Sequence, residues 1–355
     1  MDEPLVRLEG LRKIYGEAVA VESIDLSIAA GEFVVLLGPS GSGKTTILSM
    51  LGGFVEPSGG RILIEGEDVT ALPPAKRPTA TVFQDYALFP HMSVRSNVAF
   101  GLAMRRVAKP ERDSTAEEML RLVGLGGFGS RGIHQLSGGQ RQRVALARAM
   151  AVAPKVLLLD EPLGALDLAL RRQMQEELVR LQKRLGTTFV HVTHDQEEAM
   201  SIADTVVVMN RGRIEDMGPP SRVYLRPASL FTATFMGESN VIAGTVAEAV
   251  GGKLAVDTPL GRLLVDGQGA AGETVRLCIR PEQLSIAGSR GTDLFLGQVR
   301  VTERSFQGTH LRLHVVSEAD GRTELLLRVS VDDDVPVGET VEAHARASDV
   351  VVLRG

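Results

Sequence analysis

The sequence of 355 residues is poor in cysteine, in aromatic residues and in long apolar runs. Its one cysteine, Cys278, excludes an intrachain disulfide and a cluster of cysteine metal ligands, which fits a reducing compartment. No apolar run approaches the roughly 20 residues that a membrane-spanning helix needs. The first residues, Met1 to Pro4, lack the basic and apolar regions of a signal peptide. We therefore expect a soluble protein that reaches a membrane only through partners.

An excess of positive charge is also missing, because the net charge is −5. Residues 238–355 hold 17 acidic and 12 basic side chains, which leaves 27 of each sign in residues 1–237. The C-terminal third thus carries the whole imbalance. The electrostatic field of a net negative chain does not attract nucleic acid or anionic lipid, so we expect neither as a general partner.

Strand-like and helix-like stretches alternate up to about Met236. This alternation is typical of an α/β domain whose mostly parallel sheet has helices packed on its faces. We place this domain at residues 1–237 and interpret the polar stretch at about 87–152 as a helical subdomain. Its expected strands are 33–37, 156–159, 188–192 and 205–209, and its expected helices include 140–151 and 167–185.

After Gly237 the sequence changes to short apolar runs that are separated by Gly, Pro and Asp. Short strands at this spacing predict a small all-β domain, a barrel or a sandwich, over residues 238–355. Its expected strands are 241–246, 253–257, 261–265, 274–279, 298–305, 310–316, 324–329 and 340–345.

A phosphate-binding loop lies between an apolar strand and a helix that begins at Thr46. The pattern G-x-x-x-x-G-K-[S/T] is matched by Gly-Pro-Ser-Gly-Ser-Gly-Lys-Thr at positions 38–45. In such a loop the backbone N–H groups surround phosphate oxygens, Lys44 pairs with the β and γ phosphates, and Thr45 can ligate Mg²⁺. The expected nucleotide ligands are Gly38, Pro39, Ser40, Gly41, Ser42, Gly43, Lys44, Thr45 and Thr46.

Two carboxylates end the apolar strand at 156–159. Because adjacent strand residues point to opposite sides, Asp160 and Glu161 should have different tasks. Asp160 fits a partner of Mg²⁺, and Glu161 fits the general base that polarises an attacking water.

A second anion-binding segment reads Leu-Ser-Gly-Gly-Gln-Arg-Gln-Arg at positions 136–143. A serine and two glycines at a helix start place backbone N–H groups around an anion. One chain rarely needs two triphosphate cradles, so we expect this segment to hold the γ phosphate that is bound by another copy. The expected contacts of this kind are Ser137, Gly138, Gly139 and Gln140.

With these motifs in this order, residues 3–237 resemble the ATP-binding cassette (ABC) family, which implies an ATPase that uses ATP and Mg²⁺. Tyr15 lies where the family has an aromatic residue that stacks on adenine. Gln84 matches the Q-loop glutamine, which is expected beside the metal together with Thr45 and Asp160. Asp167, after Leu166, matches the D-loop that communicates across the dimer. His194 matches the switch histidine that contacts the γ phosphate. The expected catalytic residues are therefore Glu161, His194, Gln84 and Lys44.

Among ABC proteins, an importer subunit fits this chain best. Only 92 residues separate Lys44 from Ser137, whereas DNA-repair members insert long coiled coils there. Translation-type members carry two cassettes in one chain, and exporters usually contain membrane spans. Residues 86–94 and 97–102 resemble prokaryotic importer ATPases for polyamines, ferric iron, sulfate and sugars. This resemblance implies a peripheral subunit at the cytoplasmic face of the inner membrane, with two permease subunits docking near Gln84 to Met92 and a substrate-binding protein in the complete system.

The C-terminal strands resemble the OB-like TOBE domain of the same importers. Phe295 and Phe306 are its only aromatic residues, so it lacks a stacking platform for single-stranded nucleic acid. We interpret it as a dimerisation or regulatory module, and ligand sensing or sequestration of a partner stays an alternative. Residues 235–240 resemble polyamine-type cassettes, with ferric iron, sulfate and sugars as alternative substrates. Whether the cassettes pair as a homodimer or with a second cassette is left open by the sequence.

Overall fold

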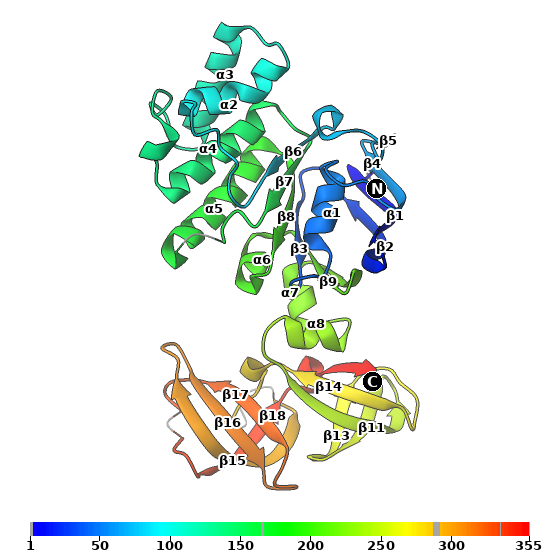
Figure 1. Cartoon of the computed structure of the whole chain (residues 1–355). Helices are drawn as coiled ribbons and strands as arrows, with labels where there is room; N and C mark the ends of the chain where they lie inside the picture. Colours follow the sequence, from blue (N-terminus) through cyan, green and yellow to red (C-terminus); the bar gives the residue numbers. More distant parts are fainter. Residues whose placement is uncertain (1–2, 165–166, 287–291, 334, 355) are drawn as a thin grey trace. The chain divides into compact units, whose positions relative to one another are not determined.

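The structure is a computed structural model that describes residues 3–164, 167–286, 292–333 and 335–354 (Figure 1). The chain divides into two units, Met1–Pro220 and Ser221–Gly355. The domain boundary that the sequence predicts, at residue 237, lies 17 residues after the division at Pro220. Two short helices lie between these positions and belong mainly to the second unit. These helices are α7 (Pro220–Leu225) and α8 (Leu230–Phe235).

A six-stranded sheet forms the centre of the first unit, and five of its strands run parallel. The strand order is β10-β9-β3-β8-β7-β6, with only β10 antiparallel to its neighbour. The carboxyl ends of the parallel strands consequently meet at one edge of the sheet. All four expected strands are confirmed. The strands are β3 (Phe33–Leu37), β6 (Thr79–Val82), β7 (Val156–Asp160), β8 (Thr188–Thr193), β9 (Thr205–Asn210) and β10 (Arg213–Gly218).

Helices α1 (Lys44–Leu51), α5 (Leu168–Leu185) and α6 (Gln196–Ile202) also belong to this unit. Helix α5 buries an apolar face that includes Met174 and Leu178. The helix ends at Gly186, whose left-handed backbone (φ 64°) suits glycine. Both helices expected from the sequence, 140–151 and 167–185, are present to within a few residues.

A second, antiparallel sheet of the first unit was not predicted. Its strand order is β2-β1-β4-β5, and its buried side chains share one hydrophobic core with those of β3 and α1. The alternation of apolar and polar residues in β2 is the sequence signal for such a half-buried strand. The strands are β1 (Val6–Tyr15), β2 (Ala18–Ile28), β4 (Gly59–Ile64) and β5 (Glu67–Asp68).

The stretch expected to be helical, 87–152, contains three α-helices. The Ser93 hydroxyl caps the first by accepting a hydrogen bond from Ser96 N at 3.2 Å. The helices are α2 (Val94–Met104), α3 (Lys109–Leu122) and α4 (Gly138–Ala151). Short 3₁₀ turns of the chain lie at Pro74–Lys76, Ile133–Gln135, Pro281–Gln283 and Ala347–Asp349.

Two antiparallel sheets, of five and four strands, form the second unit. Their orders are β13-β12-β11-β14-β19 and β17-β16-β15-β18, and their inner faces share one hydrophobic core. All eight expected strands are confirmed, and only β19 was missed. The strands are β11 (Asn240–Val250), β12 (Lys253–Thr258), β13 (Gly261–Asp266), β14 (Thr274–Ile279), β15 (Leu294–Phe306), β16 (Leu311–Ser317), β17 (Glu324–Val329), β18 (Thr340–Ala345) and β19 (Val351–Arg354).

A buried arginine ties α7 and α8 to this β domain. The Arg280 guanidinium donates to Ala233 O at 2.7 Å, to Glu238 O at 3.0 Å and to Tyr224 O at 2.9 Å. It also lies over the Tyr224 ring, 4.2 Å from the ring centroid. These contacts explain why the helices group with the strands that follow them.

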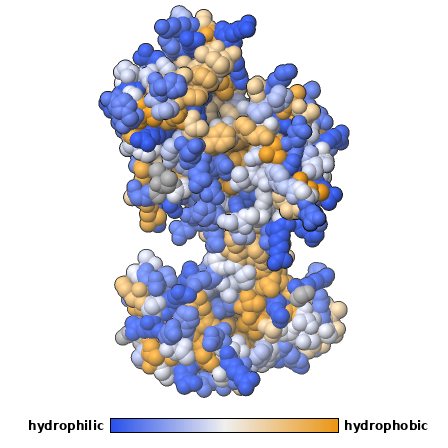
Figure 2. All heavy atoms as spheres, viewed as in Figure 1, coloured by the Kyte–Doolittle hydropathy of each residue, from blue (hydrophilic) through white to orange (hydrophobic). Residues whose placement is uncertain are grey.

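Hydrophilic side chains cover most of the visible surface, and apolar ones gather around α7 and α8 (Figure 2). Leu225 and Leu230 of these helices are both exposed. Within the described part of the chain, no helix has the length and apolar character needed to cross a membrane.

Candidate functional site

Four predicted site residues follow four neighbouring strands at the carboxyl edge of the central sheet. Lys44 follows β3, His194 follows β8, Glu161 follows β7 and Gln84 follows β6, in the spatial order of those strands. Because the strands are parallel and in register, the segments after them lie side by side. Residues far apart in the sequence are thereby brought to one site.

The phosphate-binding loop surrounds a hollow of about 210 Å³. Gly43 adopts a left-handed backbone (φ 99°) directly before α1, which few other residues can do without strain. A Cβ on Gly38 would lie 2.3 Å from Met209 O, so no side chain fits there. The hollow is lined by Ala20, Gly41, Ser42, Gly43, Lys44, Thr45 and Thr46.

Lys44 is buried and makes contact with neutral oxygens. Its Nζ donates to Gly38 O at 2.8 Å, to Pro39 O at 2.9 Å and to Ser42 Oγ at 3.4 Å. Burial lowers the pKa of Lys44, and the negative charges of Glu161 and Asp160 oppose that shift. Among the described residues no carboxylate forms an ion pair with Lys44, so this cation is available to an anionic ligand.

Thr45 and Asp160 meet across the loop. The Thr45 hydroxyl lies 3.5 Å from Asp160 Oδ1, which places two oxygen ligands next to each other. Burial raises the pKa of Asp160, the charge of Glu161 raises it further, and the Thr45 hydroxyl acts in the opposite direction. Hard oxygen donors of this kind suit Mg²⁺, and a divalent cation would favour the ionised form of Asp160.

Glu161 and His194 form a direct pair. His194 Nδ1 lies 3.2 Å from Glu161 Oε1, and the histidine ring is largely exposed. Glu161 has a left-handed backbone (φ 44°), which is unusual outside glycine and is typical of functional positions. The Glu161 N–H donates to Val192 O at 3.1 Å, which fixes this residue beside the end of β8.

A chain of hydrogen bonds holds the loop that carries His194, and sequence reasoning missed it. Glu198 is buried; its two carboxylate oxygens accept from the Thr193 hydroxyl at 2.5 Å and contact His191 Nε2 at 3.1 Å. Burial acts to raise the pKa of Glu198, but the charge and hydrogen bond of His191 and the Thr193 hydroxyl lower it below its usual value. A histidine within an otherwise apolar strand was the available sequence signal.

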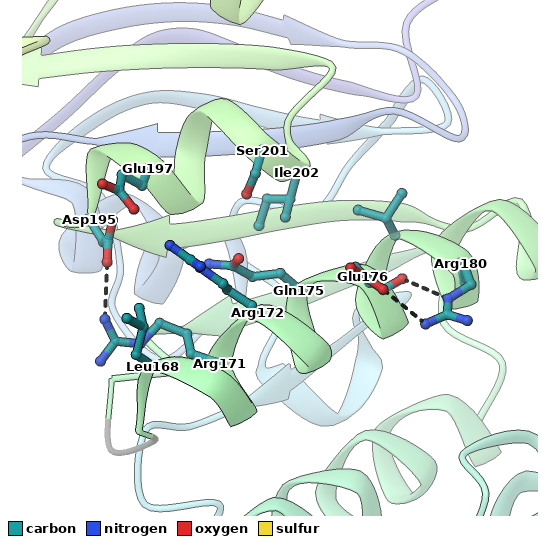
Figure 3. A pocket seen from close by; sticks show the side chains of 11 residues that line it. Leu168, Arg171, Arg172, Gln175, Glu176, Arg180, Asp195, Glu197, Ser201 and Ile202 are labelled. Carbon is teal, nitrogen blue, oxygen red and sulfur yellow. Dashed lines mark hydrogen bonds and ion pairs between the residues drawn. The ribbon is translucent and has the colours of Figure 1, made fainter. Parts of the chain in front are cut away.

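This chain of hydrogen bonds continues to α5. Asp195 Oδ1 accepts from Glu198 N at 3.1 Å, and its Oδ2 lies 3.1 Å from Arg171 Nη1. Figure 3 shows this pair at one end of a groove of about 750 Å³ between α5 and α6. The groove contains none of the predicted site residues. The residues on both sides of His194 are therefore fixed, although His194 itself is exposed.

Gln84 lies at an exposed turn after β6. The turn is closed by a hydrogen bond of 2.9 Å from Tyr86 N to Phe83 O. A Cβ on Gly164 would lie 4.0 Å from Gln84 Nε2, so Gln84 is beside the loop that follows Glu161. Arg148 and Asn97, which hold the segment after this turn, were not predicted.

The second anion-binding segment stands apart from the phosphate-binding loop. Ser137 and Gln140 cap α4 reciprocally, through Gln140 N to Ser137 Oγ at 3.3 Å and Ser137 N to Gln140 Oε1 at 3.0 Å. Gly138 is exposed, and Gly139 packs against Leu170. Among the residues with described positions, no hydrogen bond or ion pair joins this segment to the loop at 38–45. Gly138, which is exposed between these two capping residues, is accessible to a ligand that is held elsewhere.

Asp167 and Tyr15 complete the predicted set. Asp167 caps α5 by accepting from Leu170 N at 3.0 Å, while Leu166, the other predicted D-loop residue, lies outside the described residues. Tyr15 ends β1 with an exposed ring, and Lys13 Nζ lies 4.9 Å from its centroid. An exposed ring can stack on a flat ligand.

Comparisons with known proteins agree with this arrangement. A family model described as "ABC transporter" matches residues 21–164, and one described as "TOBE domain" matches residues 277–353. The chain is 47% identical over 340 residues to the spermidine/putrescine import ATP-binding protein PotA of Marinobacter nauticus, covering 95% of this chain and 90% of that protein. It is 45% identical over 357 residues to the protein of the same name from Pseudomonas aeruginosa, covering 98% of both.

Two solved structures are similar over the first part of the chain. One is cbiO1 of Clostridium perfringens, described as part of the ABC transporter complex cbiONQ, with a TM-score of 0.59, 32% identity and coverage of 62% of this chain and 91% of that one. The other is a dimeric ATP-binding cassette in a post-hydrolysis state with ADP and Pi, with a TM-score of 0.54, 32% identity and coverage of 61% and 98%.

Proposed function

The chain belongs to the ABC family of transporter ATPases and has a C-terminal TOBE domain, and from this premise we propose that it powers the import of polyamines. The observation that carries this proposal is the similarity to import ATP-binding proteins named for spermidine and putrescine over nearly the whole length of both chains. The sequence at residues 235–240 resembles polyamine-type cassettes more than the sugar group, and ferric iron and sulfate remain the alternative substrates.

The site residues support binding of ATP with Mg²⁺. The backbone N–H groups of the loop at 38–45 and the Lys44 ammonium would hold the phosphates, and the exposed Tyr15 ring would stack on adenine. Thr45, Asp160 and Gln84 would hold the metal, because the first two already place oxygens 3.5 Å apart. When bound, Mg²⁺ would neutralise charge on the phosphate oxygens.

Glu161 is the proposed general base of hydrolysis. Its carboxylate would accept the proton of the attacking water, and its contact with His194 at 3.2 Å would keep it oriented. His194 would then donate a hydrogen bond toward the γ phosphate, from a loop that Glu198 and Asp195 hold in place. Lys44 would stabilise the charge that develops on the phosphate.

The separation of residues 137–140 from the phosphate-binding loop favours a head-to-tail homodimer. In it, Ser137, Gly138, Gly139 and Gln140 of one chain would contact the ATP that is bound by the other, and Asp167 would lie near the contact. Each ATP would then bridge two chains, so binding closes the dimer and hydrolysis opens it. Such a dimer can drive movement in an attached membrane protein.

We place the membrane partners at the helical subdomain. Two permease subunits would dock near Gln84 to Met92, and a substrate-binding protein would deliver the polyamine to them. The chain would therefore be a peripheral subunit at the cytoplasmic face of the inner membrane. Nucleic acid is not an expected partner, because the acidic, aromatic-poor C-terminal domain offers no platform for it.

The substrate class can be tested on the complete transporter. The full chain, with its permease subunits, is placed in lipid vesicles, and ATP hydrolysis is measured as binding proteins loaded with polyamine, ferric iron, sulfate or sugar are added in turn. We expect stimulation only by the polyamine-loaded protein. Stimulation by another one would reassign the substrate, and hydrolysis without any ATP-dependent uptake would contradict the role in import.

A further inference from the structure

The segment after Gln84 contains two consecutive residues in the left-handed backbone region. Tyr86 has φ 62° and Ala87 has φ 44°. Side chains other than glycine rarely adopt this conformation, and they keep it only where surrounding contacts impose it. Something in the fold must therefore hold these two residues.

The contact that holds them comes from α4. Arg148 Nη2 donates to Tyr86 O at 2.8 Å, and its Nη1 donates to Ala87 O at 2.6 Å. The guanidinium also lies 5.7 Å from the centroid of the Phe89 ring. Burial lowers the pKa of Arg148, and Asp85 opposes this only from a distance, because no carboxylate within the described part of the chain forms an ion pair with it.

A guanidinium suits this task because of its shape. Its planar fork binds two acceptors at once in a fixed geometry, which the single ammonium of lysine does not reproduce. A partly desolvated charge whose hydrogen bonds go to backbone carbonyls is costly unless those bonds are kept. Arg148 and the turn at Tyr86 and Ala87 should consequently move together.

A second buried side chain fixes the other end of the same segment. Asn97, fully buried in α2, accepts from Phe89 N at 2.8 Å and donates to Phe89 O and Ser93 O, both at 3.1 Å. Residues 86–93 are thus held at both ends by helices of the helical subdomain. The segment is not a loose loop but an extension of α2 and α4.

The same helix α4 begins at the segment that we assign to the ATP of the other chain. Ser137 caps its first turn, and Arg148 lies about three turns later. One continuous helix therefore links the two places. We propose that Arg148 is a positioning residue that couples them: when residues 137–140 engage ATP, α4 shifts and Arg148 carries residues 86–92 with it. This assignment rests on the proposed function, because it needs the dimer.

The coupling can be measured on the full chain without a membrane partner. The sequence contains no tryptophan, so Leu88→Trp introduces a single fluorescent reporter into the segment. The Leu88→Trp substitution is combined with Glu161→Gln, a variant that should bind ATP without hydrolysing it. Dimer formation is followed by light scattering in the same samples. We expect tryptophan emission to change in step with ATP-dependent dimer formation.

Arg148→Lys is the decisive variant, because it keeps the charge and removes the fork. We expect an emission change at least about fivefold smaller although the dimer still forms. Arg105→Lys is the matched control, since Arg105 of the same subdomain donates to one backbone carbonyl, that of Val152 at 2.9 Å. A full emission change in Arg148→Lys would overturn the assignment. A parent reporter that stays monomeric with ATP would instead contradict the proposed dimer.

A second measurement needs no substitution at Arg148, in case that variant folds poorly. Hydrogen exchange on the Glu161→Gln chain is compared with and without ATP. We expect amides of residues 86–92 to gain protection together with those of residues 137–148. Protection of residues 137–148 alone would contradict the coupling. In the complete transporter, Arg148→Lys should keep the basal ATPase rate within about twofold and lose most of its stimulation by the loaded binding protein.

Discussion

The phosphate-binding site of the first unit and the strand contacts of the second unit use charged side chains in opposite ways. In the first unit, the hydrogen bonds of Lys44 and Asp160 to other described residues go to neutral groups, a set of carbonyl and hydroxyl oxygens. In the second unit, Glu238 is held between Arg312 Nη2 at 2.6 Å and Arg328 Nη2 at 2.8 Å. The first arrangement leaves charge available to a ligand, whereas the second uses charge to join strands.

Strand direction explains this difference. Parallel strands bring all their carboxyl ends to one edge, where polar loops meet and form a site. Antiparallel strands alternate in direction, so their loops are divided between both ends of each sheet. The polar and charged side chains of the second unit therefore connect neighbouring elements. The Asn240 amide, for example, binds both the N–H and the C=O of Leu326. We infer that chemistry resides in the first unit.

The largest expected effect comes from removing the charges of the first unit. Lys44→Ala should abolish ATP binding, and Glu161→Gln should keep binding but lower the hydrolysis rate by about 10³-fold, because the general base is lost. ATP binding and steady-state hydrolysis are measured on the full chain. Lys155→Ala is the control, since the ion pair that Lys155 forms with Glu65 is exposed and should contribute little. Undiminished hydrolysis in Glu161→Gln would remove this residue as the base.

The next effect concerns stability of the second unit. Arg280→Met removes a buried guanidinium that donates to the backbone of α7, of α8 and of Glu238 just before β11. Its loss should destabilise this unit by about 3 kcal/mol. Arg276→Met on β14, the strand that precedes Arg280, is the control, because no side-chain hydrogen bond is described for Arg276. Denaturant unfolding is the measurement, and ATP binding should be unchanged. A loss of ATP affinity that equals the loss in Lys44→Ala would break the division between the units.

A smaller effect is expected where the first unit does pair its charges. Glu198→Gln weakens the hold on the loop around His194, so kcat should fall by about tenfold with KM within about twofold. Glu197→Gln, an exposed neighbour on α6, is the control. Steady-state kinetics separate the two constants. A change confined to KM would mean that the loop serves binding alone.

The smallest effect is expected at Cys278. Its thiol is 3% exposed, and burial raises its pKa to about 11, so it should react slowly with thiol reagents at pH 8. Because the proposed ATP site lies in the first unit, ATP should leave the labelling rate of Cys278 within about twofold. The release of a chromophore during labelling measures this rate. A strong decrease in the labelling rate of Cys278 on addition of ATP would show that the two units are energetically coupled.

Much of this organisation could be predicted from the sequence. The strand ends at Leu37 and Asp160 were predictable because apolar runs there are followed by motifs with a known chemical purpose. The sheet β2-β1-β4-β5 was missed, because the alternating pattern of β2 was overlooked and the pairing of β1 with β4 joins residues that are far apart in the sequence. Strand β19 was missed because it has only four residues.

The contacts that hold the site were harder to predict. Arg148 and Glu198 look like ordinary helix residues, and their importance arises from which carbonyl or hydroxyl group the fold places beside them. The left-handed backbone at Tyr86 and Ala87 has no sequence signal either, because neither residue is glycine. Tertiary geometry decides these features.

The most direct test of the ATP-driven dimer is the molar mass of the Glu161→Gln chain in solution. Light scattering after size exclusion gives that mass with and without ATP and Mg²⁺. We predict 38.0 kDa without nucleotide and twice that value with it, and a return to the single mass when Ser137→Arg is added. A chain that stays at 38.0 kDa with saturating ATP would contradict the proposed mechanism.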